Sequence, residues 1–405
     1  MRVLIIGGGA SGLTAALTAA ECPDNQVTLL ERQARVGRKL TATGNGRCNL
    51  TNLHAGPDHY HGQRPDFVRP ALENFGVQTA LAWFSSLGLV TAAEPSGRVY
   101  PFSDQAGSVV DVLRLALEQS GARVETGCET RALTWRDGAF FAETEGQLFT
   151  ADRVIVACGG VAGGRLGGTD AGYRLLASLG HTRTALYPAL VQLRTDPACV
   201  RALKGIRTQA AVSLRRGEET LGESQGEIQF AEYGLSGPCI FALSRAVSAS
   251  AGEITAVLDL LPQMEQAALE RLLREKAARF PALTLENLLT GVLQNRLGRT
   301  VVRFCGLVLD APLSSLSAAK LHQLAAAVKA FPLPVTGTLG MDQAQVTAGG
   351  VCTGEFDPDT LESRLCPALY ACGEVLDVDG DCGGYNLQWA WSSGRLAGQM
   401  KGTNR

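Results

Sequence analysis

The sequence lacks most features that assign a chain to a class at first sight. No apolar run reaches the ~18 residues that a membrane span requires. The eleven cysteines form no C-x-x-C pair, so neither a zinc cluster nor a thioredoxin-like pair is indicated, and we expect most of them to be buried and reduced. An apolar run follows Met1 directly and leaves no room for a signal peptide, so we expect a cytoplasmic protein. The net charge of −2 indicates no class of partner.

A glycine-rich turn near the N-terminus carries the strongest signal. An apolar run leads into Gly7, Gly9 and Gly12 in G-x-G-x-x-G spacing, and an Ala-rich stretch and a second apolar run that ends at Glu31 follow. Gly7 permits a tight turn, Gly9 lets the backbone approach a pyrophosphate, and Gly12 lets helix and strand pack closely. The helix N-terminus would face the phosphates and Glu31 the ribose hydroxyls. The pattern predicts a dinucleotide site. A turn that only packs is the alternative, and it leaves Glu31 unexplained.

The 405 residues are too many for one small core and indicate several domains. Strands and helices alternate to residue 182, which predicts the first part of a nucleotide-binding domain (1–182). Short alternating strands then indicate an inserted β-rich domain (183–261), and Leu and Ala at helical spacing indicate an inserted helical domain (262–335). The last segment is glycine-rich again and is expected to return to the nucleotide-binding domain (336–405).

Several long and unusual motifs resemble one protein family. They are GRKLTATGNGRCNLTN at 37–52, LSGP at 235–238, TAGGV at 347–351, and the stretch from GEVLDVDG to GGYNLQ at 373–388. Together they are similar to the BaiN/YhiN-like family of FAD-dependent oxidoreductases over essentially the whole chain. The resemblance implies an α/β fold, in which a glutathione-reductase-like FAD-binding Rossmann domain of three layers (ββα) is interrupted by an inserted β-barrel-like domain and a small helical domain. It also implies tight, non-covalent FAD.

The resemblance further implies which residues surround FAD. The pyrophosphate, adenosine and neighbouring strand would use Gly7, Gly9, Ala10, Ser11, Gly12, Glu31, Ala157 and Gly159, and Arg131 belongs to the same set. The flavin side would use Arg32, Lys39, Asn45, Gly46, Arg47 and Cys48, and Gly373 and Glu374 would lie by the ribityl chain and phosphate. Gly384, Tyr385, Asn386 and Leu387 would offer backbone N–H groups to the pyrimidine end of the isoalloxazine, where negative charge develops on reduction.

One loop departs from the family pattern. The family often has an aromatic, Pro-containing stretch after the Gly-Gly of the strand on the ADP side. Residues 161–168 of this chain read VAGGRLGG instead. Since this loop should flank the active site, the substrate of a family member does not transfer directly.

Cys48 and Tyr385 are the predicted catalytic residues, and Tyr173 is a further proton donor to consider. Arg47 and Lys39 are close to Cys48 in sequence, and positive neighbours favour a thiolate. As a thiol, Cys48 would donate a proton to one carbon of a double bond while flavin N5 delivers hydride to the other. The alternative is that Cys48 only packs in the turn that positions FAD.

No metal site is expected. His54, His59 and His61 share a loop but lack a matching pattern of Cys or carboxylates. Asp377, Asp379 and Asp381 are spaced in a vaguely calcium-like way, but the Gly-Gly-Tyr-Asn that follows favours a flavin turn.

The charges of the insert bear on partners. Residues 183–330 contain 17 Lys and Arg against 13 Asp and Glu. Six basic residues come early: Arg194, Arg201, Lys204, Arg207, Arg215 and Arg216. They predict either a solvated face or a footprint for an RNA backbone, although no aromatic stacking platform is visible.

Three functions stay open at this point. In the leading one, NAD(P)H reduces the flavin and the flavin reduces a uracil in large-subunit ribosomal RNA to dihydrouridine. In the second, the acceptor is a small enone such as an oxidised steroid or bile acid. In the third, the protein is an FAD-bound redox sensor or scaffold without turnover. No second complete G-x-G-x-x-G is present, so nicotinamide is expected to bind transiently. The sequence gives no oligomeric state.

Overall fold

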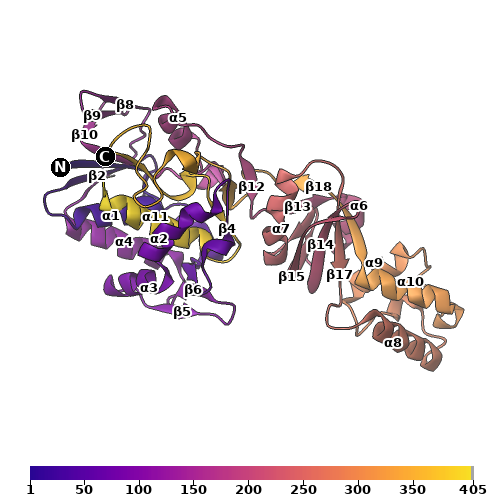
Figure 1. The fold of residues 1–405 in the computed structure, drawn as a ribbon. Helices are drawn as coiled ribbons and strands as arrows, with labels where there is room; N and C mark the ends of the chain where they lie inside the picture. Colours follow the sequence, from indigo (N-terminus) through magenta and orange to yellow (C-terminus); the bar gives the residue numbers. More distant parts are fainter. Residues whose placement is uncertain (403–405) are drawn as a thin grey trace. The chain divides into compact units, whose positions relative to one another are not determined.

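The computed structural model describes residues 1–402, which form two compact units (Figure 1). The first unit contains residues 1–188 and the described chain from 341 onward. The second unit is the insert between them, residues 189–340. Each unit has its own cluster of buried apolar side chains.

A five-stranded parallel sheet forms the centre of the first unit. Its strand order is β20-β11-β1-β2-β7, and every neighbouring pair is parallel. The strands are β1 (Arg2–Ile6), β2 (Gln26–Glu31), β7 (Arg123–Thr126), β11 (Arg153–Val156) and β20 (Leu369–Ala371). The apolar runs do not alternate with polar residues because a parallel sheet is covered on both faces.

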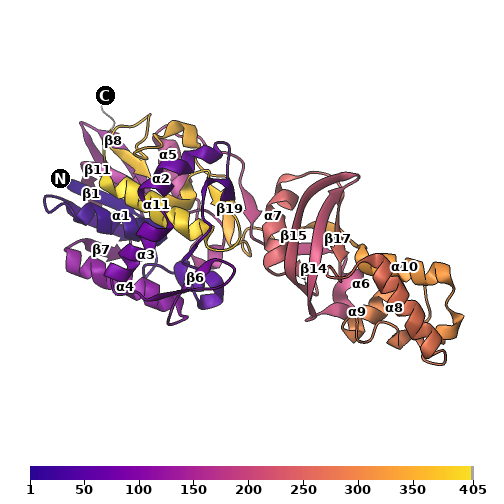
Figure 2. The same ribbon diagram turned by 60° about the horizontal axis from the view of Figure 1, so that its bottom comes forward.

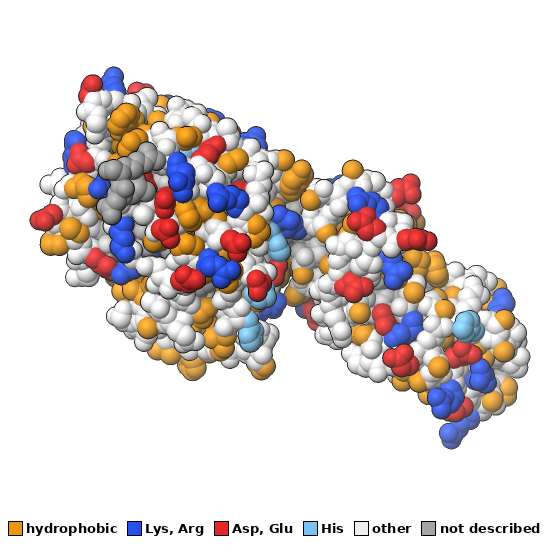
Figure 3. All heavy atoms as spheres, in the orientation of Figure 1, with side chains coloured by type: hydrophobic (Ala, Val, Ile, Leu, Met, Phe, Trp, Pro, Cys, Tyr) orange, Lys and Arg blue, Asp and Glu red, His pale blue; other side chains and the backbone are white. Residues whose placement is uncertain are grey.

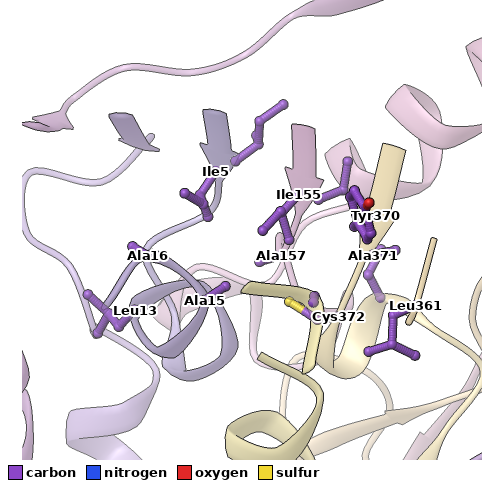
Figure 4. Close-up of a cluster of buried hydrophobic side chains, with 14 of the residues drawn as sticks. Ile5, Leu13, Ala15, Ala16, Ile155, Ala157, Leu361, Tyr370, Ala371 and Cys372 are labelled. Atoms are coloured by element: carbon purple, nitrogen blue, oxygen red, sulfur yellow. The ribbon is translucent and has the colours of Figure 1, made fainter. Parts of the chain in front are cut away.

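Two helices from opposite ends of the chain pack side by side over this sheet (Figure 2). They are α1 (Ala10–Ala20) and α11 (Tyr385–Gln399). Small residues allow the close approach, because a Cβ on Gly398 would lie 2.6 Å from the Ala15 carbonyl oxygen. The side chains of Ile5, Leu13 and Ile155 fill the core beside the helices (Figure 4).

An antiparallel sheet supplies the third layer of the first unit by packing against β1 and β11. It contains β8 (Ala132–Arg136), β9 (Ala139–Glu143) and β10 (Leu148–Ala151). The smaller strands are β3 (Thr51–Asn52), β6 (Arg98–Pro101) and β5 (Thr91–Ala93) in one sheet, the pair β4 (Tyr60–His61) and β21 (Asp379–Gly380), and the pair β12 (Tyr187–Ala189) and β19 (Val346–Ala348). The remaining helices are α2 (Arg69–Asn74), α3 (Val77–Ser86), α4 (Ala106–Ser120) and α5 (Ala171–Ser178).

The second unit is built on a closed barrel with the strand order β13-β16-β15-β14-β17-β18. The strands are β13 (Leu193–Thr195), β14 (Arg207–Arg216), β15 (Glu219–Ala231), β16 (Gly234–Ser236), β17 (Ile254–Asp259) and β18 (Phe331–Thr338). In β14, Ala210, Val212 and Leu214 are buried at every second position, as the wall of a barrel requires. The helices are α6 (Pro197–Val200), α7 (Pro238–Ala249), α8 (Gln266–Arg279), α9 (Asn295–Phe304) and α10 (Ala318–Lys329).

The predicted fold class is confirmed: a Rossmann-type α/β domain is interrupted by a barrel and helices. After the helices, β18 returns to pair with β17 and close the barrel. The predicted boundary at residue 335 between the helical insert and the C-terminal segment therefore falls inside a strand. Leu273 of α8 and Phe230 of the barrel belong to the same buried cluster. Within residues 1–402, no helix has both the length and the apolar character to cross a bilayer.

Candidate functional site

The glycine turn between β1 and α1 has the geometry that the sequence predicted. Gly7 has φ +110°, and a Cβ there would lie 2.5 Å from the Ala157 carbonyl oxygen. A Cβ on Gly12 would collide with the Gly7 carbonyl oxygen. At Gly9, by contrast, no atom of the described chain lies within 4 Å of an added Cβ. The turn is therefore closely packed at Gly7 and Gly12 and open at Gly9. A phosphate group would fit in this open space at the N-terminus of α1.

Glu31, at the end of β2, is held rigidly beside this turn. Its Oε2 accepts a hydrogen bond from the Gly8 N–H at 2.8 Å, and its Oε1 accepts one from the Gln33 N–H at 2.7 Å. A pocket opens here, and its lining includes Gly7, Glu31 and Thr130. The Thr130 hydroxyl is buried and has no hydrogen-bond partner among residues 1–402. An orphaned polar atom in a pocket is what a bound polar ligand would satisfy.

Two predicted residues of this region have other partners. Arg131 is exposed and pairs with Glu145 at 2.7 Å, so its neighbour Thr130 lines the pocket instead. The Arg32 guanidinium donates to the carbonyl oxygens of Gly167 and Gly168 at 2.9 and 3.3 Å. Arg32 therefore anchors the 161–168 loop, which is where this chain departs from the family pattern.

The middle of the site is organised by an ion pair between distant segments. The Lys39 Nζ lies 2.8 Å from the Glu374 Oε2, and the Glu374 Oε1 accepts from the Thr347 N–H at 2.8 Å. The Gly373 N–H donates to the Ser393 hydroxyl at 2.9 Å, and a Cβ on Gly373 would collide with Ser11. These contacts join the predicted pyrophosphate turn to the C-terminal segment.

The turn that contains Asn45, Gly46, Arg47 and Cys48 does not hold a thiolate. Cys48 is fully buried, and burial raises its pKa to about 12, although a hydrogen bond with Thr43 opposes the rise. The Arg47 guanidinium turns away to Asp104 at 2.5 Å and Glu94 at 3.1 Å. The expected activation of Cys48 by positive neighbours is therefore wrong, because both cations are engaged by carboxylates. The backbone of this turn is tightly wound, since Asn45 and Cys48 have φ of +57° and +61°. This geometry agrees with the alternative that Cys48 packs in a turn that positions FAD.

A second glycine turn precedes α11. Gly384, with φ +101°, caps the helix, and a Cβ there would lie 2.5 Å from the Thr51 carbonyl oxygen. The Asn386 side chain closes the turn by accepting from the Gly380 N–H and donating to the Gly380 carbonyl, both at 2.8 Å. Beside the turn, the Asn49 Oδ1 is buried without a partner among the described residues. The backbone N–H groups of Tyr385, Asn386 and Leu387 form the first turn of the helix.

Two histidines of the 57–63 loop converge on one carboxylate of this turn. His59 Nδ1 lies 2.9 Å from the Asp381 Oδ2, and His61 Nε2 lies 2.8 Å from the Asp381 Oδ1. Burial raises the pKa of Asp381, but the hydrogen bonds from His61 and His59 outweigh it and the net pKa is lowered. Within residues 1–402, no group of three or more His, Cys, Asp or Glu side chains is placed to hold a metal ion.

Both tyrosines considered as proton donors lie in the first unit. Tyr385 is 7% exposed and Tyr173 is 5% exposed, and burial raises the pKa of each phenol. Tyr385 is the first residue of α11 and stacks on His59, whereas Tyr173 lies in α5 after the 161–168 loop. With raised pKa values, both side chains are neutral phenols at neutral pH, which is the form that can donate a proton.

Three of the six early basic residues of the insert pair with carboxylates. Lys204 pairs with Glu232 at 2.6 Å, and Arg216 pairs with Glu219 at 2.7 Å. Arg207 lies 3.5 Å from Glu227. Basic and acidic side chains are interspersed over the visible face of this unit (Figure 3). The early positive charge of the insert is thus compensated in part, by the carboxylates of Glu232, Glu227 and Glu219.

The sequence matches the family model described as the HI0933-like protein Rossmann domain over residues 1–400. It is 42% identical over 402 residues to the 3-dehydro-bile acid delta(4,6)-reductase of Clostridium scindens, which covers 98% of each chain. It is 29% identical to the ribosomal RNA dihydrouridine synthase of Escherichia coli, with 96% of this chain and 95% of the relative covered. Among solved structures, the 3-ketosteroid delta1-dehydrogenase of Sterolibacterium denitrificans matches with a TM-score of 0.50 at 13% identity over 98% of both chains, a likeness of fold alone.

Proposed function

The chain belongs to the HI0933-like family of Rossmann-domain proteins, and on this premise we propose that it is an FAD-dependent oxidoreductase that reduces a carbon–carbon double bond conjugated to a carbonyl in a small molecule. One observation carries the choice of acceptor: the 42% identity over 98% of both chains to a 3-dehydro-bile acid delta(4,6)-reductase. This reverses the order of the first two of our three hypotheses from the sequence, the ribosomal RNA acceptor and the small enone. The relatives named ribosomal RNA dihydrouridine synthase are 29% and 28% identical.

The residues of the first unit fit FAD. Open space above Gly9 and the N-terminus of α1 would accept the pyrophosphate, and Glu31 the adenosine ribose. The orphaned Thr130 hydroxyl would bind the adenine end, and the orphaned Asn49 oxygen and the first turn of α11 would meet the other end. Two unsatisfied polar groups in separate parts of the unit support a long polar ligand better than a turn that only packs.

When bound, FAD would supply a hydride from N5 to the β-carbon of the enone, after taking one from NADH or NADPH. The chain's own residues would do the rest. The ion pair with Lys39 would fix the Glu374 carboxylate near the ribityl chain. The positive charge of Lys39 would then offset the repulsion between this carboxylate and the phosphates. Tyr385 would deliver the proton to the α-carbon as a neutral phenol. Its position at the glycine turn supports this role over that of Cys48, whose side chain is fully enclosed.

The RNA acceptor and the non-enzymatic sensor remain as alternatives that one experiment separates. The purified flavoprotein is reduced anaerobically with NADH or NADPH and mixed with a 3-oxo steroid that has a conjugated double bond, with its saturated 3-oxo analogue as the control, or with unmodified large-subunit ribosomal RNA. We expect the enone alone to reoxidise the flavin and to gain two hydrogen atoms. Formation of dihydrouridine without enone reduction would favour the RNA reading. No acceptor faster than oxygen would favour the sensor, and failure of both nicotinamides to bleach the flavin would refute the reductase.

A further inference from the structure

A half-buried arginine with no acidic partner lies at the second glycine turn. Arg98 is the first residue of β6 and pairs in register with Asn52 of β3. Its guanidinium forms no ion pair with any carboxylate of residues 1–402. Arg47, from the neighbouring turn, is held by two carboxylates. A half-buried guanidinium that forms no ion pair is available to bind an anionic group of a ligand through charge-assisted hydrogen bonds.

Arg98 points at the backbone of the turn itself. A Cβ on Gly383 would lie 3.3 Å from the Arg98 Nε and 3.5 Å from the Asn52 Nδ2. Asn52 donates from that nitrogen to the Gly383 carbonyl at 2.9 Å, which fixes the turn against β3. Burial and the negative charge of Asp381 raise the pKa of Tyr385, and the positive charge of Arg98 opposes this rise. Arg98 is therefore close enough to act electrostatically on groups at this turn.

A second source of positive potential converges on the same place. Gly384 caps α11, a helix of 15 residues, and the free N–H groups of its first turn carry the positive end of the helix dipole. The carboxylate of Asp381 lies near this turn, and its two oxygens are engaged by His59 and His61 and not by Arg98. The Tyr100 hydroxyl, which also faces Arg98, is a neutral phenol whose pKa is raised by burial.

We propose that Arg98 contacts the pyrimidine end of the isoalloxazine and holds the negative charge that this end gains on reduction. The proposal rests on FAD being the cofactor, as argued above. A hydride brings two electrons and one proton, so its delivery adds one negative charge to the ring system. A guanidinium at that end stabilises the charged form more than the neutral one and thereby raises the reduction potential of the flavin. Arg98 would then act on the cofactor and not on the affinity for the acceptor.

Sulfite titration tests this without an acceptor, because sulfite adds at flavin N5 and places the same negative charge on the pyrimidine end. The proteins are wild type, Arg98→Gln, Arg98→Lys, and Arg136→Gln as a matched control at an exposed arginine of β8. A charge-assisted hydrogen bond corresponds to about tenfold in affinity. We expect Arg98→Gln to weaken sulfite binding about tenfold or more, Arg98→Lys to weaken it less, and Arg136→Gln to match wild type. The midpoint potential should fall by about 30 mV for each tenfold change in the two-electron equilibrium.

Several outcomes would overturn the proposal. Unchanged sulfite affinity and potential in Arg98→Gln, with full flavin content, would show that Arg98 does not face the pyrimidine end. If Arg98→Gln does not fold, the proposal is tested by comparing Arg98→Lys with wild type. Failure of the wild-type protein to bind sulfite would contradict a positive charge at the pyrimidine end. Absence of flavin from wild type would instead refute the FAD proposal, so the two failures are distinguishable.

Discussion

The imidazole of His59 stacks on the ring of Tyr385, with ring centroids 4.3 Å apart and an interplanar angle of 27°. Asp381 anchors the imidazole from the other side at 2.9 Å, and the Tyr60 hydroxyl donates to the Tyr385 carbonyl at 3.0 Å. The loop that carries the histidines is thereby fixed to the first residue of α11. Tyr385 is thus held in place by packing. A proton donor has to be held in this way.

Replacing Tyr385 by Phe should separate the hydroxyl from the ring. The ring and its stack on His59 are retained, so we expect unchanged flavin content and thermal stability. Loss of a positioned proton donor lowers the rate by about 10²-fold or more. The measurement is the rate of flavin reoxidation by the enone under anaerobic conditions. A rate within twofold of wild type would remove Tyr385 from the proton-transfer step.

Cys48→Ala provides the competing test. The thiol is fully buried, and burial raises its pKa to about 12. We expect reoxidation at close to the wild-type rate and a loss of about 1 kcal/mol in the free energy of unfolding, as for a small buried side chain. The two are measured on the same preparation, with flavin content as the check on folding. A loss of turnover with normal flavin content would instead identify Cys48 as the proton donor.

Gly9→Ala should separate cofactor binding from folding. Gly9 has φ −81° and ψ −171°, which alanine adopts, and no described atom lies within 4 Å of its added Cβ. We expect a folded protein with flavin affinity lower by about tenfold or more, a factor that corresponds to about 1.4 kcal/mol. Gly12→Ala should instead fail to fold, because its Cβ would collide with the Gly7 carbonyl oxygen.

The control for this prediction is Gly107→Ala in α4, whose added Cβ also meets no described atom within 4 Å. We expect this variant to keep full flavin affinity and to gain about 0.5 kcal/mol of stability from reduced chain entropy. Flavin affinity is measured by titrating the apoprotein with FAD. Wild-type affinity in Gly9→Ala would contradict a pyrophosphate at this turn.

A buried histidine should make the first unit sensitive to acid. The His181 side chain is fully enclosed, its Nδ1 lies 2.8 Å from the Glu355 Oε2, and its Nε2 lies 2.9 Å from the Ser363 hydroxyl. Burial lowers the pKa of His181 despite the opposing effect of Glu355. The unfolded chain, with a histidine pKa of about 6.5, then binds a proton before the folded one. Stability should be complete above about pH 6.5 and fall as the pH drops below it.

The pH effect is measured as the urea midpoint between about pH 7.5 and 5.5. His181→Phe keeps a ring against Phe356 but leaves Glu355 and Ser363 without their partner. It should be less stable than wild type at the higher pH, with a flatter dependence on pH. His54→Gln, at an exposed histidine, should retain the wild-type slope. An equal slope in His181→Phe would assign the acid sensitivity to other groups.

The sequence predicted what depends on local chemistry. The glycine spacing, Glu31 and the apolar strands required no knowledge of distant segments, and the structure has each of them as expected. The sequence pointed to Arg131, whereas Thr130 lines the pocket, because which of two adjacent side chains faces a pocket depends on how the following strand is placed. The low pKa expected for Cys48 was wrong for a related reason: nearness in sequence does not tell where Arg47 points. Barrel closure by β18 likewise depends on pairing across more than a hundred residues.

The ion pair of Lys39 and Glu374 offers the last test, because it joins segments 335 residues apart. Lys39→Met leaves a carboxylate that is 21% exposed without its cation, and Glu374→Gln removes that charge. We expect Lys39→Met to lower both thermal stability and FAD affinity, and Lys39→Met/Glu374→Gln to recover part of each loss, with a coupling energy of about 1 kcal/mol. The same cycle on Arg2 and Asp152, whose side chains are 46% and 41% exposed, is the control and should give a smaller coupling. Equal coupling in the two cycles would mean that the site pair is no more than an ordinary surface contact and that Glu374 needs no compensation beside the phosphates.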